Sequence, residues 1–334
     1  MWMPSNYTVA LLMLICSMIC WGSWANALKM MKSCRFELFY WDYVFGTTAM
    51  SFLLAFTMGS MGTTGLPFLA DLRSAPWSNI VYASAGGVVF NAANILLTAA
   101  IEVAGLAVAF PLGVGLSIVI GVILNYLITT KNDPILLFGG VALLIAAIVF
   151  DALAYRAYAG QDAKKTTKTG ILLCIISGVG LGLFYPLVAK SISGPAHPGP
   201  FTVGVLFMLG MFLSNFVFNW AVMRWPITGQ PPVPASMYWQ MPGHWHLLGL
   251  LLGGGVWGLG TVFNFTASAT GIVGPATSFA LGDGAVMVSA VWGLLAWNEF
   301  RGAEPIVRHR LAWMFLLFFA GLGSIALSPV FSLL

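Results

Sequence analysis

Asp283 is the residue whose position in this sequence is hardest to explain by packing alone. It lies in the segment Leu281-Gly282-Asp283-Gly284, inside a long apolar stretch. A carboxylate in hydrocarbon is costly, so ionisable residues at such depth are functional candidates by default. Removal from water favours the protonated form of a carboxyl group. We therefore predict a proton-coupling site at Asp283. A direct hydrogen bond to a substrate, or pairing with Lys190 or the backbone, remains the alternative.

Two sets of polar residues repeat the spacing i, i+3, i+7 in separate apolar stretches: Asn91, Asn94 and Thr98, and Thr261, Asn264 and Ser268. This spacing places each set on one face of a helix. The functional interpretation is a polar cavity in which the amides of Asn91, Asn94 and Asn264 bind an uncharged solute. The alternative is hydrogen bonding between helices, which contributes about 0.6 kcal/mol per pair on average.

Aromatic residues accompany these polar faces. Trp21 and Trp24 are three residues apart, and Tyr185 matches Trp24 when the two halves of the chain are aligned. An indole that faces a cavity can stack on a planar ring or on a sugar. We predict that all three contact the substrate, with Lys190 at the end of the same segment; an aromatic belt at the membrane interface is the alternative for the tryptophans. Pro186 predicts a broken helix beside Tyr185.

The elements that must position these residues are membrane-spanning helices. Of 334 residues, 59% are hydrophobic and only 7% are charged, whereas soluble domains carry about 25% charged residues. Segments of roughly 20 apolar residues cross a bilayer. We predict an all-α integral membrane protein with ten such spans, at residues 8–28, 40–59, 79–101, 105–128, 135–155, 170–190, 201–223, 247–268, 274–297 and 311–331.

The basic residues give the spans a direction. With both termini outside, eleven of the fourteen Lys and Arg residues fall on the cytoplasmic side, as the positive-inside rule requires. The first span lacks a preceding Lys or Arg but is followed by Lys29, Lys32 and Arg35, which is typical of an uncleaved span. We expect a monomer or homodimer in a bacterial inner (plasma) membrane.

The two halves of the chain resemble each other. The aromatic segment of the first span recurs in the sixth, and the polar set of the third recurs in the eighth. Five spans in each half place the second half in the opposite orientation, which is an inverted repeat of the kind that many secondary transporters use. We predict a first five-helix repeat at residues 1–160 and a second at residues 161–334, within one transmembrane domain.

The sequence lacks the motifs that several other classes of function require. The phosphate-binding pattern GxxxxGK[ST] does not occur, so we expect no ATP-driven step. The cysteines have no zinc spacing, and we predict no metal, no cofactor, no catalytic residue and no nucleic-acid partner. An intramembrane enzyme is a remote alternative. His197, His244, His246 and His309 are expected in loops, and His244 and His246 are expected in an interfacial segment without a nearby acid.

Short motifs resemble the drug/metabolite transporter superfamily. Gly22-Ser23-Trp24 is similar to the Gly-Thr-Trp-Pro segment of ureide permeases. The run from residues 103–108 through residues 119–126 is similar to the third-to-fourth span region of the same family. The glucose/ribose and rhamnose transporter branch is similar at residues 297–302 and at Ala189-Lys190. The resemblance implies proton-coupled import of ureides, nucleobases or sugars. Ala25 replaces the proline of ureide permeases, and their central nucleotide-like motif is missing from residues 156–169.

Together these observations predict a secondary active transporter for a small, neutral, polar solute, coupled to protons. Within the same superfamily, a multidrug or metabolite exporter is the alternative. A helical scaffold without a substrate is a third interpretation, and it predicts no binding pocket.

Overall fold

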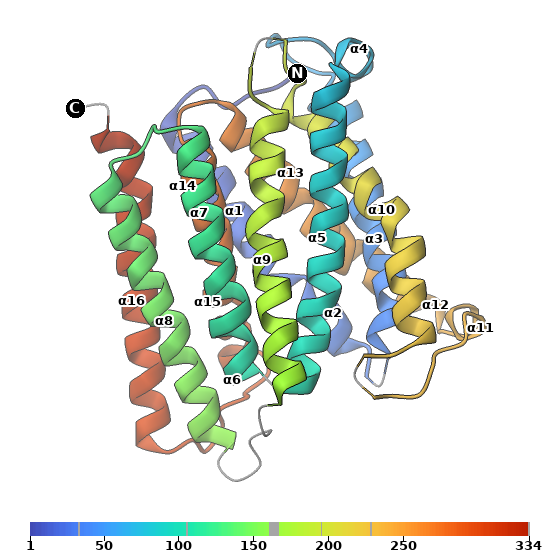
Figure 1. Cartoon of the computed structure of the whole chain (residues 1–334), viewed down its shortest axis with the longest axis vertical. Helices are drawn as coiled ribbons and strands as arrows, with labels where there is room; N and C mark the ends of the chain where they lie inside the picture. The colour runs from blue at the N-terminus through green and yellow to red at the C-terminus, as the bar shows by residue number, and fades with distance from the viewer. Residues whose placement is uncertain (33, 105, 160–166, 195, 228, 333–334) are drawn as a thin grey trace.

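The computed structural model is a bundle of long helices (Figure 1), and it describes residues 1–32, 34–104, 106–159, 167–194, 196–227 and 229–332. The first half contains α1 (Tyr7–Ser23), α2 (Ala25–Met30), α3 (Phe36–Phe56), α4 (Phe68–Ser74), α5 (Trp77–Ala104), α6 (Leu106–Ala109), a π-helical turn η1 (Phe110–Val114), α7 (Gly115–Ile128) and α8 (Pro134–Ala159). The second half contains α9 (Lys168–Ser191), α10 (Pro200–Arg224), α11 (Ser236–Trp239), α12 (Gly243–Leu247), a π-helical turn η3 (Leu248–Gly255), α13 (Val256–Ala269), α14 (Pro275–Asp283), α15 (Ala285–Leu295) and α16 (Pro305–Phe331).

Each predicted span falls on a helical segment, and the helices are those of an integral membrane protein. Among the described residues, eight helical segments are long and apolar enough to cross a membrane. The segment Leu112–Ile128 is a shorter apolar helix. The remaining predicted span lies on α3, whose 21 residues include Glu37 and Asp42. Ten crossings and the inverted repeat therefore stay predictions.

The helices are interrupted at other positions than the one predicted from Pro186. Helix α9 continues through Pro186 to Ser191, so the expected break there is wrong. Neighbouring helices in a membrane protein can satisfy the backbone groups that a proline releases. Instead, the first span is interrupted at Trp24, between α1 and α2, and the ninth is interrupted at Gly284, directly after Asp283. Two residues singled out for their chemistry thus lie at helix interruptions.

Helices from the two halves of the chain are interleaved. Helix α5 of the first half packs along α9 and α10 of the second, and α1 packs along α13 and α15. Helices α8 and α16 run beside each other at one side of the bundle (Figure 1). Since each half packs mainly against the other, the halves are not separate bodies.

Two crossings between the halves, of α5 with α10 and of α3 with η3, bring backbones into direct contact. A Cβ atom at Gly87 on α5 would lie 1.9 Å from the carbonyl oxygen of Phe207 on α10. At Gly254 in η3, a Cβ atom would lie 2.0 Å from the carbonyl oxygen of Tyr43 on α3. Small residues allow this close approach of membrane helices. The two crossings hold α5 against α10 and η3 against α3.

The bundle has two distinct ends. Both termini and α4 lie at one end (Figure 1), which we call the terminal end. The other end, which we call the opposite end, carries the connections from α2 to α3, from α10 to η3 and from α15 to α16.

Candidate functional site

Aromatic rings fill the centre of the bundle, where α1, α3, α5 and α13 meet. Trp257 stacks on Phe90 at 4.7 Å between ring centroids and on Trp21 at 5.9 Å. The side chain of Trp21 is only 9% exposed, and its Nε1 donates a hydrogen bond of 2.9 Å to Thr261 Oγ1. Trp21 therefore belongs to the interior of the bundle rather than to an aromatic belt.

Trp24 lies next to this centre and is partly buried. Its ring centroid is 4.7 Å from that of Tyr43 and 6.1 Å from that of Phe39, both on α3. The interruption between α1 and α2 thus places Trp24 among aromatic rings, which is compatible with either substrate contact or packing.

The asparagines of both polar sets are hydrogen-bonded to tyrosines. The Tyr40 hydroxyl donates to Asn91 Oδ1 at 3.0 Å and accepts from Asn94 Nδ2 at 3.1 Å. In the second half, the Tyr185 hydroxyl donates to Asn264 Oδ1 at 2.5 Å. The alternative of interhelical hydrogen bonding is therefore realised in this conformation. The role of Tyr40 was missed because its position in the sequence carries no pattern that links it to the asparagines.

Asp283 ends α14 close to the second of these clusters. A Cβ atom at the preceding Gly282 would lie 2.5 Å from the Trp21 ring and 2.9 Å from Asn264 Nδ2. Asp283 Oδ2 is buried and has no hydrogen-bond partner. The structure thus brings Trp21, Tyr185 and Asn264 together around Gly282, and the next residue of the chain, Asp283, carries a buried oxygen without a hydrogen-bond partner.

Lys190 does not join this group. It is exposed near the end of α9, with its ammonium nitrogen 5.7 Å from the centroid of the Tyr82 ring. The ion pairs of the described residues join Lys29 to Glu299 and Arg35 to Glu37, and His246 Nδ1 contacts the Asp42 carboxyl group. The alternative in which Lys190 neutralises Asp283 is therefore wrong, because α9 carries Lys190 to the surface.

Cavities lie at both ends of the ninth span. A cavity of about 130 Å³ toward the terminal end is lined by Gly274, Pro275 and Ser268. A second, of about 230 Å³ toward the opposite end, is lined by Val286 and Ser289 of α15. Asp283 lies between these two sets of lining residues along the chain.

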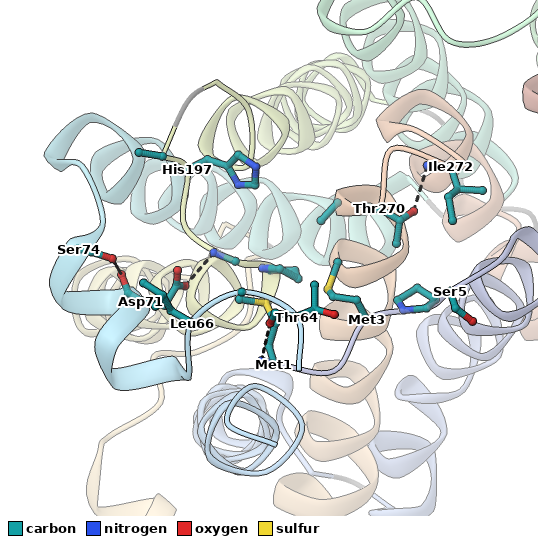
Figure 2. Close-up of a pocket in the computed structure, with 16 residues that line it drawn as sticks. Met1, Met3, Ser5, Thr64, Leu66, Asp71, Ser74, His197, Thr270 and Ile272 are labelled. Atoms are coloured by element: carbon teal, nitrogen blue, oxygen red, sulfur yellow. Dashed lines mark hydrogen bonds between the residues drawn. The ribbon is translucent and has the colours of Figure 1, made fainter. Parts of the chain in front are cut away.

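A larger cavity of about 760 Å³ opens at the terminal end (Figure 2). Its polar groups hold the surrounding segments together. The Met1 amino group donates to Thr64 O at 2.7 Å, and Asp71 accepts from the backbone N–H of Gly199 at 2.8 Å and from the Thr202 hydroxyl. Asp71 thereby provides a hydrogen-bond acceptor for a backbone N–H group at the start of α10, so its role here is structural.

One acidic cluster was not predicted from the sequence. Asp42 on α3 is buried, and it accepts a hydrogen bond of 2.5 Å from the Tyr238 hydroxyl. His246 Nδ1 lies 2.8 Å from Asp42 Oδ2. Burial, together with the Asp42 carboxylate, raises the pKa of Tyr238, so this phenol stays a hydrogen-bond donor. The cluster ties α11 and α12 to α3.

The histidine prediction is corrected by the same contacts. His244 and His246 lie on α12 and His309 lies on α16, so these three are not in loops. His246 also has a nearby acid. Sequence spacing could not show this, because Asp42 and His246 are 204 residues apart.

The fold and its buried polar centre are those of an α-helical integral membrane protein with polar side chains in its interior. Within that class, the chain is similar to the ureide permease family, whose model matches residues 39–172. Ureide permease 1 of Arabidopsis thaliana is 22% identical over 345 residues, which cover 84% of this chain and 86% of that protein. Probable ureide permease A3 of Vigna unguiculata is 31% identical over 151 residues, covering 43% and 40%.

A protein of known crystal structure has the same fold. It superimposes with a TM-score of 0.67 at 16% identity, and the match covers 95% of this chain and 96% of the other. At this identity the likeness concerns the fold alone.

Proposed function

We propose that this chain is a secondary transporter of the ureide permease type, which moves a small neutral ureide or a related polar solute in symport with protons. Similarity to proteins named ureide permeases supports the solute class. Asp283 carries the proton-coupling part of the proposal. Its side chain has a buried, unpartnered oxygen at a helix interruption, and the preceding residue, Gly282, lies against Trp21 and Asn264. A carboxyl group in that environment can bind and release a proton as its surroundings change.

The solute would bind by replacing hydrogen bonds that the protein makes to itself. A ureide carries amide N–H and C=O groups, which match the acceptors and donors of Asn91, Asn94 and Asn264. Tyr40 and Tyr185 hold these amides in the present conformation. Trp21 and Trp24 supply faces on which a planar solute can stack.

Access to this centre would alternate between the two cavities that flank the ninth span. The interruptions at Trp24 and Gly284 supply hinges. Since the close crossings at Gly87 and Gly254 join helices of different halves, the moving units would contain helices from both repeats. Rocking of residues 1–160 against residues 161–334 as two blocks is not compatible with this packing.

The pairing of helices supports the inverted repeat. Exchanging the five spans of the first half with those of the second converts the α5–α9 contact into the α13–α1 contact, and the α5–α10 contact into the contact between α3 and η3. The α8–α16 contact is unchanged by the same exchange. A pseudo-two-fold axis in the membrane plane produces this pattern.

Proton coupling is tested with Asp283→Asn in proteoliposomes. Asparagine keeps the shape of the side chain but cannot bind a proton, so accumulation of allantoin driven by a pH gradient should fall to the level without a gradient. Downhill exchange of allantoin should persist, because solute binding uses other residues.

The matched control is Asp133→Asn. Asp133 accepts a hydrogen bond from Leu136 N at the start of α8, a capping role that asparagine also performs. This variant should accumulate allantoin as the wild type does. Normal gradient-driven accumulation by Asp283→Asn would refute its role as the proton carrier.

A further inference from the structure

A second buried carboxylate, Asp151 of α8, borders a cavity at the opposite end of the bundle. Asp151 is only 1% exposed, and its Oδ1 has no hydrogen-bond partner. The cavity has a volume of about 230 Å³ and is also lined by residues of α1, α2 and α15. Asp151 lines the cavity while its Oδ1 is buried without a partner, so a turn of the side chain toward the cavity would offer this oxygen to a hydrogen-bond donor.

The other charged groups of this cavity are engaged with each other. Lys29 forms an ion pair with Glu299, and the Tyr155 hydroxyl donates to Glu299 Oε2 at 2.8 Å. Trp297 Nε1 donates to Asn26 Oδ1 at 2.6 Å. Among these polar side chains, Asp151 is the one with an oxygen left unpaired.

The charges restrict what could occupy the space. Glu299 is paired with Lys29, so the charge left over in this cavity is that of Asp151 in its ionised form, which disfavours an anion. A carboxylate accepts two N–H groups from one face of a planar urea, amide or guanidinium group. The indoles of Trp292 and Trp297 also line the cavity and give it apolar wall area for a planar solute.

We propose that this cavity is a second solute-binding site, in which Asp151 accepts the N–H groups of a compact neutral or cationic solute of the urea, amide or guanidine type. In size, the cavity of about 230 Å³ equals about eight water molecules at roughly 30 Å³ each. Its relation to transport rests on the proposed function: Val286 and Ser289 follow Asp283 along the ninth span and line this cavity. The site therefore lies on the solute pathway between the centre of the bundle and the opposite end.

A thiol introduced by Ser289→Cys reports occupancy of the cavity directly. The full-length protein would carry this substitution with its four native cysteines, Cys16, Cys20, Cys34 and Cys174, replaced by alanine. The measured quantity is the rate of modification by a small methanethiosulfonate reagent. Allantoin and the guanidinium ion should slow modification, and allantoate, which carries a carboxylate, should not.

Asp151→Asn should then raise the allantoin concentration needed for half-protection about ten- to hundredfold, as expected for loss of a hydrogen bond to a charged group. Asp133→Asn, directly before the same helix and outside the cavity, should leave protection unchanged. Equal protection in Asp151→Asn and the wild-type background would overturn the proposal.

A measurement without a substitution at Asp151 guards against misfolding of that variant. In an N-methylated analogue of allantoin, a methyl group replaces the hydrogen that would be donated to Asp151. This analogue should protect the introduced thiol poorly in the protein that retains Asp151. Protection equal to that of allantoin would overturn the role of the N–H groups. Absence of transport with intact protection would refute the transport function while leaving this site standing.

Discussion

Three aspartates, Asp42, Asp151 and Asp283, lie within helices that fall on predicted spans, and their side chains differ in whether they have partners. Asp42 contacts His246 and Tyr238. Asp283 and Asp151 each have one buried oxygen without a hydrogen-bond partner. The carboxyl groups with an unsatisfied oxygen are the better candidates for binding a proton or a solute. In a partnered carboxyl group, hydrogen bonds within the protein already replace those lost from water.

The neighbourhood of Asp42 gives a pH-dependent prediction at Cys34. Burial, together with the nearby Asp42 carboxylate, raises the pKa of the Cys34 thiol to about 11. Only the thiolate is nucleophilic, so alkylation by iodoacetamide should be slow at pH 8. The rate should increase about tenfold per pH unit up to the pKa. The measurement is peptide mass spectrometry on protein that retains Cys34 as its sole cysteine.

Glutathione in the same tube provides the reference thiol. An ordinary thiol with a pKa of about 8.5 stops gaining reactivity above that pH. A Cys34 alkylation rate that levels off together with that of glutathione would contradict the predicted environment.

Sequence reasoning identified several residues of the centre but not their partners. The spacing of the asparagines and the depth of Asp283 are visible because helical periodicity and hydropathy are local properties. The hydrogen bonds that join Asn91 and Asn94 to Tyr40, and Asn264 to Tyr185, cross between helices and therefore depend on tertiary packing. Asp151 was overlooked because it stands alone in an apolar helix, without the glycines that draw attention to Asp283.

Among the elements, the close crossing of α5 and α10 gives the clearest prediction for stability. In Gly87→Ala, the new methyl group would lie 1.9 Å from Phe207 O unless the helices separate. Overpacking costs about 1–3 kcal/mol, so thermal unfolding in detergent should occur at a lower temperature. Fluorescence-detected unfolding measures the shift.

Gly139→Ala is the matched control on α8. A Cβ atom at Gly139 meets no atom within 4 Å, and alanine is favoured over glycine in a helix by up to about 1 kcal/mol. Its unfolding temperature should stay the same or rise. Equal destabilisation by both substitutions would show that the crossing is not responsible.

The positions of the helices were predictable, whereas their interruptions were not. Apolar length alone placed the ten segments, since the bilayer fixes the length of a span. Pro186 suggested a break because proline removes a backbone donor, yet α9 is continuous and the interruptions lie at Trp24 and Gly284. Whether a helix bends depends on the neighbours that satisfy its backbone, and those neighbours are not encoded within the segment.

For the whole molecule, the distribution of basic residues predicts that both termini lie outside the cytoplasm. The termini are at the same end of the bundle (Figure 1), so both should report one compartment. Alkaline phosphatase fused to the C-terminus should be active in bacteria, because it folds in the oxidising periplasm. Green fluorescent protein at that position should be dark. A fluorescent fusion with inactive phosphatase would reverse the predicted orientation.

The interleaving of the halves has a consequence for how such genes can diversify. The faces of α5 and α3 that carry Gly87 and Gly46 are matched to backbone atoms of α10 and η3 beyond the midpoint of the chain. A recombination event at that midpoint would join a first half to a second half that had never adapted to it. We therefore expect homologues of this protein to diverge by coordinated change on both sides of the midpoint rather than by exchange of intact halves.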